Sequence, residues 1–230
     1  MFRERIKARM NKLIVIEGLD GSGKATQAKR LAEELARQGH AVRQVSFPDY
    51  DSPSSALVKM YLAGEFGDRP SDVNAYAAST FYAVDRYASY MKHWRQDYAR
   101  GVVIADRYTT SNAIHQCSKL EPEEWDGFLQ WLFDFEYRKM GIPQPDLVVY
   151  LRVDPEVSQA LMLSRYDGHE ERRDIHEKDL DYLRRCQRAA DYCARHLGWT
   201  VVECCSGGKM RAIESIQAEI MRLVAGTVDR

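Results

Sequence analysis

The chain has 230 residues, 45% of them hydrophobic and 29% charged, which fits one globular domain of moderate size with a substantial core. Its 33 basic and 34 acidic side chains leave a formal charge of −1, so the composition gives no electrostatic case for binding nucleic acid or a membrane surface. No apolar run approaches the length of a membrane span, and we expect no transmembrane segment.

Residues 1–11 are expected to form an extension that precedes the folded domain. They are charged and lack the apolar core of a signal peptide, and we expect at most a short helix there. The five cysteines show no metal-type spacing, and Cys186 and Cys193 repeat on one helical face, as core thiols do. We therefore expect no disulfide framework and a cytoplasmic location.

Five short apolar runs rich in valine and isoleucine alternate with helical stretches along the rest of the chain. The predicted strands are residues 13–17, 41–46, 102–105, 147–151 and 200–203. Nearly continuous apolarity is typical of parallel strands that are covered on both faces. The pattern therefore predicts a single three-layer α/β domain over residues 12–230, without an internal boundary.

The segment from Gly18 to Thr26 is predicted to be a phosphate-binding loop. It follows the strand at 13–17 and precedes a helical pattern, which is the context that such a loop requires. Its glycines let backbone N–H groups point at a phosphate at the positive end of the helix, and Lys24 adds a cation against the β- and γ-phosphate oxygens. A chance match in an ordinary strand–turn–helix is the alternative, and the flanking pattern disfavours it.

One residue of this loop departs from the usual pattern, because Ala25 stands where a hydroxyl group normally reaches a magnesium ion. Thr26 lies about 100° further around the helix, so its hydroxyl is not expected to replace that ligand. Either the ion keeps an extra water molecule or a carboxylate helps to hold it. Asp20 and Asp106 are the candidate metal ligands.

The end of the third predicted strand carries a second candidate site for a phosphate group. Ligand crevices of parallel sheets lie beyond the carboxyl ends of the strands, where Asp106 is followed at once by Arg107. A guanidinium at this point offers two parallel hydrogen bonds to a phosphate that faces the loop. A structural ion pair is the alternative interpretation of Arg107.

The tyrosine-rich helical stretch at 72–100 contains Tyr82 and Arg86 one turn apart. Such a pair can stack on a base and hydrogen-bond to it, although the residue pattern alone favours core packing and a surface ion pair. A second polar stretch, at 164–174, is rich in arginine and is expected to be either a mobile lid over the phosphates or a solvated charged loop.

Taken in order, these segments resemble the thymidylate kinases, which phosphorylate dTMP with ATP. The resemblance runs from Lys12 to the end of the last strand and rests on Glu17–Lys24, Phe47–Tyr50, Asp85–Arg86, Asp106–Tyr108 with Ser111–Asn112, and the arginine-bearing stretch before residues 174–177. It implies a P-loop kinase fold with a five-stranded parallel sheet, a mobile lid, a homodimer, and magnesium-dependent phosphoryl transfer between two nucleotides.

The resemblance also implies a role for each matching position. The ATP phosphates would be cradled by Gly18, Leu19, Asp20, Gly21, Ser22, Gly23, Lys24, Ala25 and Thr26. Lys24 would stabilise the transferring group, and Asp20 would lie between donor and acceptor near the magnesium ion. Arg107 would bind the dTMP phosphate, with Tyr50 closing the same pocket. The base and sugar site would be lined by Tyr82 as the stacking aromatic, Arg86 as the thymine-binding arginine, Ser111, Asn112 and His115.

Two positions can be compared with the variation that is found within this family. Gly21 is retained, as in the subgroup whose catalytic arginine comes from the lid, so Arg165, Arg172 or Arg173 would supply that charge. His115 stands where several members have a tyrosine that screens against a ribose 2′-hydroxyl. Another nucleoside or nucleotide kinase, and a non-catalytic ATP-binding switch, stay open as alternatives; the second phosphate cation disfavours the switch.

Overall fold

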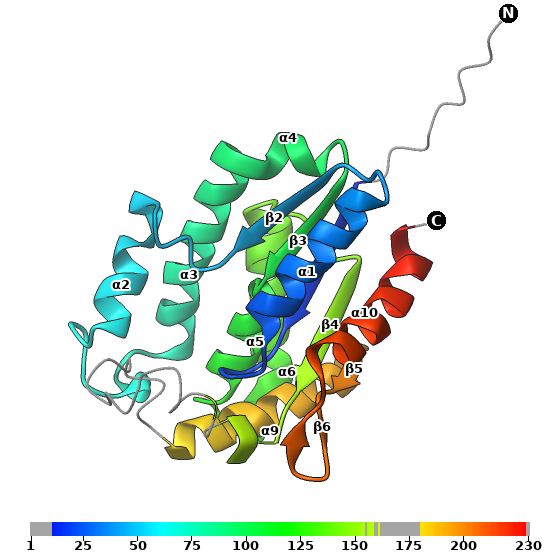
Figure 1. Ribbon diagram of the computed structural model, residues 1–230. Coiled ribbons are helices and arrows are strands. Elements are labelled where there is room, and N and C mark those ends of the chain that lie inside the picture. The colour runs from blue at the N-terminus through cyan, green and yellow to red at the C-terminus, as the bar shows by residue number, and fades with distance from the viewer. Residues whose placement is uncertain (1–10, 155, 159–160, 162–179, 229–230) are drawn as a thin grey trace, which may run out of the picture.

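The computed structural model describes residues 11–154, 156–158, 161 and 180–228 (Figure 1). Five parallel strands form one sheet in the order β2–β3–β1–β4–β5. Their bounds are Lys12–Glu17 (β1), Val42–Ser46 (β2), Val102–Asp106 (β3), Leu147–Arg152 (β4) and Thr200–Glu203 (β5). The predicted five-stranded parallel sheet is confirmed, and no strand end differs from its predicted position by more than one residue.

Alternate residues of the central strand β1 pack into opposite layers of the molecule. Ile14 and Ile16 lie in the cluster with α1 (Lys24–Arg37) and α10 (Ile213–Val228), whereas Leu13 and Val15 lie in an aromatic cluster on the other face. All four side chains are fully buried, and each contributes about 1.5–3 kcal/mol by leaving water. Burial on both faces explains the nearly continuous apolarity of β1, β3 and β4, whereas the edge strand β2 carries exposed polar residues.

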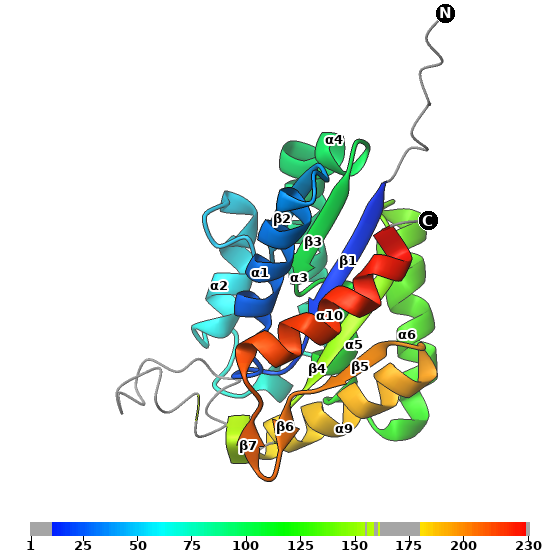
Figure 2. The same ribbon diagram turned by 45° about the vertical axis from the view of Figure 1, so that its right-hand side comes forward.

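The helices cover both faces of the sheet, with α1 and α10 on one side and the others mainly on the opposite side (Figure 2). These others are α2 (Ala56–Leu62), α3 (Ala75–Ser89), α4 (Arg95–Tyr98), α5 (Thr109–Cys117), α6 (Trp125–Phe133) and α9 (Leu180–His196). A small hairpin joins β6 (Cys205–Ser206) to β7 (Lys209–Met210). The predicted three-layer α/β arrangement is therefore confirmed.

The tyrosine-rich stretch is not one helix from residue 72 to residue 100. Asn74 accepts a hydrogen bond from the Ala77 backbone N–H at 2.9 Å, and this side-chain cap starts α3 only at Ala75. A π-helical turn, η3 (Tyr90–Trp94), then separates α3 from α4, and a second one, η5 (Asp134–Lys139), follows α6. Single turns of this kind are often found at functional sites.

Glycines end two of the helices, and the expectation that Cys186 and Cys193 are core thiols is confirmed. Gly39 and Gly198 have φ angles of 91° and 67°, the left-handed conformation with which many helices end. Cys186 and Cys193 are fully buried in the core, and the five cysteines carry free thiols. None of the described helices combines the length and apolarity that a membrane crossing requires.

Candidate active site

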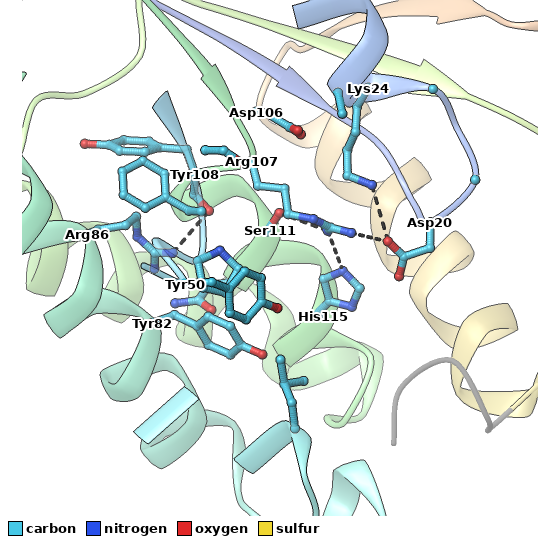
Figure 3. Close-up of a pocket in the computed structure, with 18 of the residues that line it drawn as sticks. Asp20, Lys24, Tyr50, Tyr82, Arg86, Asp106, Arg107, Tyr108, Ser111 and His115 are labelled. Carbon is cyan, nitrogen blue, oxygen red and sulfur yellow. Dashed lines mark hydrogen bonds and ion pairs between the residues drawn. The ribbon is translucent and has the colours of Figure 1, made fainter. Parts of the chain in front are cut away.

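The carboxyl ends of β1, β2 and β3 open into one cavity of about 420 Å³ (Figure 3). Parallel pairing sets Ile16 of β1 and Ser46 of β2 opposite Asp106 of β3, so the segments that follow these strands leave the sheet together. The predicted site residues that line the cavity are Asp20, Gly21, Gly23, Lys24, Ala25, Thr26, Tyr50, Tyr82, Arg86, Asp106, Arg107, Ser111, Asn112 and His115. The structure thus brings the two predicted phosphate sites into a single space.

Two glycines of the phosphate loop adopt a backbone conformation that residues with a Cβ atom rarely adopt. Gly21 and Gly23 have φ angles of 78° and 81°. A Cβ atom on Gly18 would lie 2.4 Å from the Ser22 hydroxyl oxygen and 3.1 Å from the Leu151 carbonyl oxygen. The loop therefore packs tightly under the N-terminus of α1, whose free N–H groups and positive dipole favour an anion.

Asp20 lies between two cations that come from different strand ends. Lys24 Nζ donates to Asp20 Oδ1 at 3.3 Å and to the Leu19 carbonyl at 3.2 Å, and Arg107 Nη2 donates to the same Asp20 oxygen. Burial alone would raise the pKa of Asp20, but the charges of Arg107 and Lys24 outweigh it and hold that pKa well below its usual range. Asp20 is therefore ionised at neutral pH and is shared by both cations.

Arg107 has a strained backbone conformation, and several hydrogen bonds hold it in place. Its φ angle of 65° is left-handed, which costs a residue with a Cβ atom about 1–2 kcal/mol. Its backbone N–H donates to the Ile16 carbonyl at 3.2 Å, and Nη1 donates to the Ser111 hydroxyl at 3.4 Å. Backbone strain of this kind is retained mainly at functional sites, and here it turns the guanidinium into the cavity.

His115 accepts a hydrogen bond from Arg107, because its Nε2 lies 3.3 Å from Arg107 Nη1, which can only donate. Its Nδ1 lies 3.2 Å from the Tyr182 hydroxyl. Burial, together with the charge of Arg107, lowers the pKa of His115 to about 3. The imidazole is therefore neutral at physiological pH and carries its proton on Nδ1.

The end of the cavity around Arg86 contains a buried ion pair that the residue pattern alone did not predict. Arg86 donates to Glu136 through Nε at 2.8 Å and through Nη2 at 2.5 Å, and both side chains are almost completely buried. The surface ion pair that the residue pattern alone favoured for Arg86 is therefore wrong. Burial would lower the pKa of Arg86, but Glu136 outweighs it and raises that pKa.

The segment after β2 is held at the rim of the cavity by Asp85. The Asp49 backbone N–H donates to Asp85 Oδ2 at 2.8 Å, and the Ser54 hydroxyl donates to Asp85 Oδ1 at 2.6 Å. These bonds place Tyr50 at the opening, where half of its side chain is exposed. Tyr82, one turn before Arg86 on α3, lines the wall beside it.

Sequence reasoning gave no individual role to two buried carboxylates of the site, Glu136 and Glu17. Glu17 accepts from the Gly18 N–H at 2.9 Å, from the Thr110 hydroxyl at 2.6 Å, and from the Ser111 hydroxyl. An acidic residue at the end of an otherwise apolar strand was a signal for Glu17. Nothing in the local pattern around Glu136 indicated that its partner is fifty positions away in the sequence.

The residues near the phosphate loop fit a magnesium ion bound through carboxylates. Among the described residues, Asp106 Oδ1 is a buried oxygen without a hydrogen-bond partner, and burial raises the pKa of Asp106. Magnesium is usually bound by one or two protein carboxylates together with substrate phosphates and water. Asp106 and Asp20 can supply such a set, whereas Ala25 and Thr26 are both exposed at the start of α1.

The predicted lid, residues 164–174, lies outside the described residues. Arg165, Arg172 and Arg173 belong to it, so their expected role stays a prediction. The described part of the site already has a phosphate loop, a facing arginine at the end of the neighbouring strand β3, and a pocket whose far end, around Arg86, is polar. With the sheet order β2–β3–β1–β4–β5, these features define a P-loop nucleoside monophosphate kinase.

The profile of one family, thymidylate kinase, matches residues 16–216. The thymidylate kinase of Mycobacterium tuberculosis is 34% identical over 197 residues, which cover 83% of this chain and 90% of the relative. The human thymidylate kinase is 29% identical over 147 residues, covering 64% of this chain and 63% of that protein. A solved structure of thymidylate kinase from Candida albicans superposes with a TM-score of 0.67 at 19% identity, over 94% of this chain and 91% of that one.

The chain belongs to the thymidylate kinase family. It is therefore an ATP-dependent nucleoside monophosphate kinase, and the alternative of a non-catalytic switch is not supported.

Proposed function

We propose that this chain transfers the γ-phosphoryl group of ATP to the phosphate of dTMP in the cavity between Lys24 and Arg107. The observation that carries this proposal is the shared carboxylate of Asp20, which contacts both cations. Two cations from neighbouring strand ends thus face one space of about 420 Å³. That arrangement suits two phosphate groups that must approach each other.

The reaction needs positioning and charge neutralisation more than proton transfer. The attacking oxygen of dTMP already carries negative charge, so a general base is unnecessary, and repulsion between the two nucleotides is the main obstacle. Lys24 would stabilise the transferring group, and Arg107 would orient the acceptor phosphate. When bound, magnesium would neutralise charge on the donor phosphates, and Asp106 and Asp20 would hold it.

The end of the cavity around Arg86 and Asn112, which we call the base end, supports thymine as the acceptor base. Asn112 Nδ2 donates to the Ser79 carbonyl at 3.1 Å and to Glu136 Oε1 at 3.2 Å, which leaves Asn112 Oδ1 as the acceptor for a ligand. Arg86 offers N–H donors beside it. A donor next to an acceptor matches the O4 and N3–H of thymine, whereas cytosine presents N4–H₂ and an unprotonated N3.

A coupled assay for ADP release tests the proposed reaction. We expect release to require both ATP and dTMP, and to be slower with dCMP, dAMP and dGMP. ADP release that is equally fast with and without dTMP would contradict the proposal. Faster ADP release with another nucleoside monophosphate would mean that the preferred substrate is not dTMP.

We also propose that the chain forms a homodimer through α3. Tyr76, Val84, Tyr87 and Met91 lie at helical spacing along α3 and η3, and each is more than a third exposed. A row of exposed apolar side chains of this kind favours a protein contact. Light scattering after size exclusion should give a dimer, which Val84→Arg should dissociate. Ile213→Arg, an equally exposed apolar position on α10, serves as the control.

The cytoplasmic location stays a prediction, favoured by the free thiols.

A further inference from the structure

Glu136 is the most completely buried carboxylate of the base end, and its two oxygens accept four hydrogen bonds. Oε2 accepts from Arg86 Nε at 2.8 Å and from the Thr109 hydroxyl at 2.7 Å. Oε1 accepts from Arg86 Nη2 at 2.5 Å and from Asn112 Nδ2 at 3.2 Å. The two side chains placed against the base therefore share one carboxylate.

This carboxylate decides which way the Asn112 amide faces. Asn112 Nδ2 lies between the Ser79 carbonyl and Glu136 Oε1, and both of these oxygens can only accept. Rotation of the amide by half a turn would set Asn112 Oδ1 against two acceptors inside a buried site. The amide group is thereby fixed with its donors toward the protein and its acceptor toward the cavity.

The same carboxylate fixes the position of the Arg86 guanidinium. Two parallel hydrogen bonds to Glu136 define its plane, and Nη1 reaches the Tyr108 carbonyl at 3.4 Å. A guanidinium carries five N–H groups, so donors are left over for a ligand. Glu136 also lies in the π-helical turn η5, a local departure from α-helical geometry that is frequent at functional sites.

We propose that Glu136 is a positioning residue that sets base selectivity by holding Arg86 as a donor and Asn112 as an acceptor. This inference rests on the base site proposed above. A 4-oxo pyrimidine with a proton on N3 satisfies both groups. A 4-amino pyrimidine would instead set its amino donor against the N–H donors of Arg86, and its N3 acceptor against Asn112 Oδ1. Buried polar groups left without partners are the strongest basis for rejecting a wrong substrate.

A purely structural role for Glu136 makes a different prediction. If the carboxylate only compensated the buried charge of Arg86, its loss would reduce the amount of folded protein and lower activity equally for every acceptor. The ratio of kcat/KM for dTMP to that for dCMP would then stay constant. A positioning role requires this ratio to fall.

Three variants separate the two roles. Glu136→Asp keeps the charge but withdraws the carboxylate by one methylene group. Thr109→Val removes one hydrogen bond to Glu136, and Thr110→Val is its matched control, because the neighbouring Thr110 hydroxyl donates instead to Glu17 at 2.6 Å. Each variant is assayed for kcat and KM with dTMP and dCMP, after its thermal unfolding has shown that it is folded.

We expect Glu136→Asp to lower the dTMP-to-dCMP ratio by at least about 10-fold, the equivalent of one hydrogen bond to a charged group. Thr109→Val should lower the ratio several-fold, and Thr110→Val should leave it unchanged. An unchanged ratio in Glu136→Asp, or an equal change in both threonine variants, would overturn the inference. If Arg86→Lys and Asn112→Ala also leave the ratio unchanged, the proposed base site itself is wrong.

Discussion

Arg107 combines an expected role in phosphate binding with a strained backbone, and two substitutions separate these properties. Arg107→Ala and Arg107→Gly both remove the guanidinium, so both should weaken dTMP binding equally. They differ in the cost of the φ angle of 65°, which glycine adopts freely and alanine does not. The pair therefore tests function and strain independently.

The expected loss of affinity follows from the contacts of the guanidinium. Arg107 donates to Asp20, Ser111 and His115, and a phosphate would take at least two of these N–H groups. Each hydrogen bond to a charged group contributes about 1.5–3 kcal/mol. Because Arg107 must first release Asp20, we use the lower end, about 3 kcal/mol in total, which is about 100-fold in the KM for dTMP.

The expected gain in stability comes from the backbone alone. A left-handed residue with a Cβ atom costs about 1–2 kcal/mol, and the greater freedom of glycine in the unfolded chain offsets about half of that. Arg107→Gly should therefore have a free energy of unfolding about 0.5–1 kcal/mol above that of Arg107→Ala.

Steady-state kinetics and urea denaturation of both variants provide the measurements. The KM for ATP should change little, because the ATP phosphates are assigned to the loop around Lys24. If the KM for dTMP stayed normal while that for ATP rose, the assignment of Arg107 to the acceptor would be refuted. Equal free energies of unfolding for the two variants would refute the strain argument, but the assignment of Arg107 to the acceptor phosphate would be unaffected.

Three further predictions concern single residues. Lys24→Ala should abolish turnover because the transferring group loses its cation, while circular dichroism shows an unchanged fold; near-normal activity would contradict the phosphate-loop role. Because the pKa of His115 is lowered to about 3, the pH profile of kcat/KM for dTMP should show no histidine ionisation between about pH 5 and 8. A step near pH 6.5 that disappears in His115→Gln would contradict the neutral imidazole. Burial lowers the pKa of Lys119 to about 7, so the unfolded chain binds more protons above that value. The free energy of unfolding should then rise with pH from about 7 to 10 by up to about 1.4 kcal/mol per unit, and this slope should be absent in Lys119→Met.

The parts of the structure that depend on neighbouring residues in the sequence could be predicted well. Strand ends were placed within one residue because the inner strands β1, β3 and β4 are buried and apolar at nearly every position. The phosphate loop could be predicted because its glycines, Lys24 and the following helix are contiguous in the sequence. Arg107 could be placed because parallel strands end at a common edge.

Features set by contacts between distant segments could not be predicted. The residue pattern could not show that Arg86 is buried, because its partner Glu136 lies fifty positions away on a π-helical turn. The orientation of the Asn112 amide depends on the Ser79 carbonyl of another helix. The protonation of His115 depends on burial and on the guanidinium of Arg107, neither of which is evident from its place in α5.

Carboxylates neutralise the positive charges at the two ends of the cavity in different ways, and this difference has a chemical reason. Asp20 is partly exposed and shared by Lys24 and Arg107, so in the proposed reaction an arriving phosphate would replace it on either cation. Glu136 is fully buried and bound by four donors, so Arg86 and Asn112 keep their positions whether or not a base is present. A base recognised by fixed groups requires little reorganisation, which favours selectivity. In the proposed reaction, Lys24 and Arg107 would instead change partners as the phosphates bind, and a single shared carboxylate would allow that exchange.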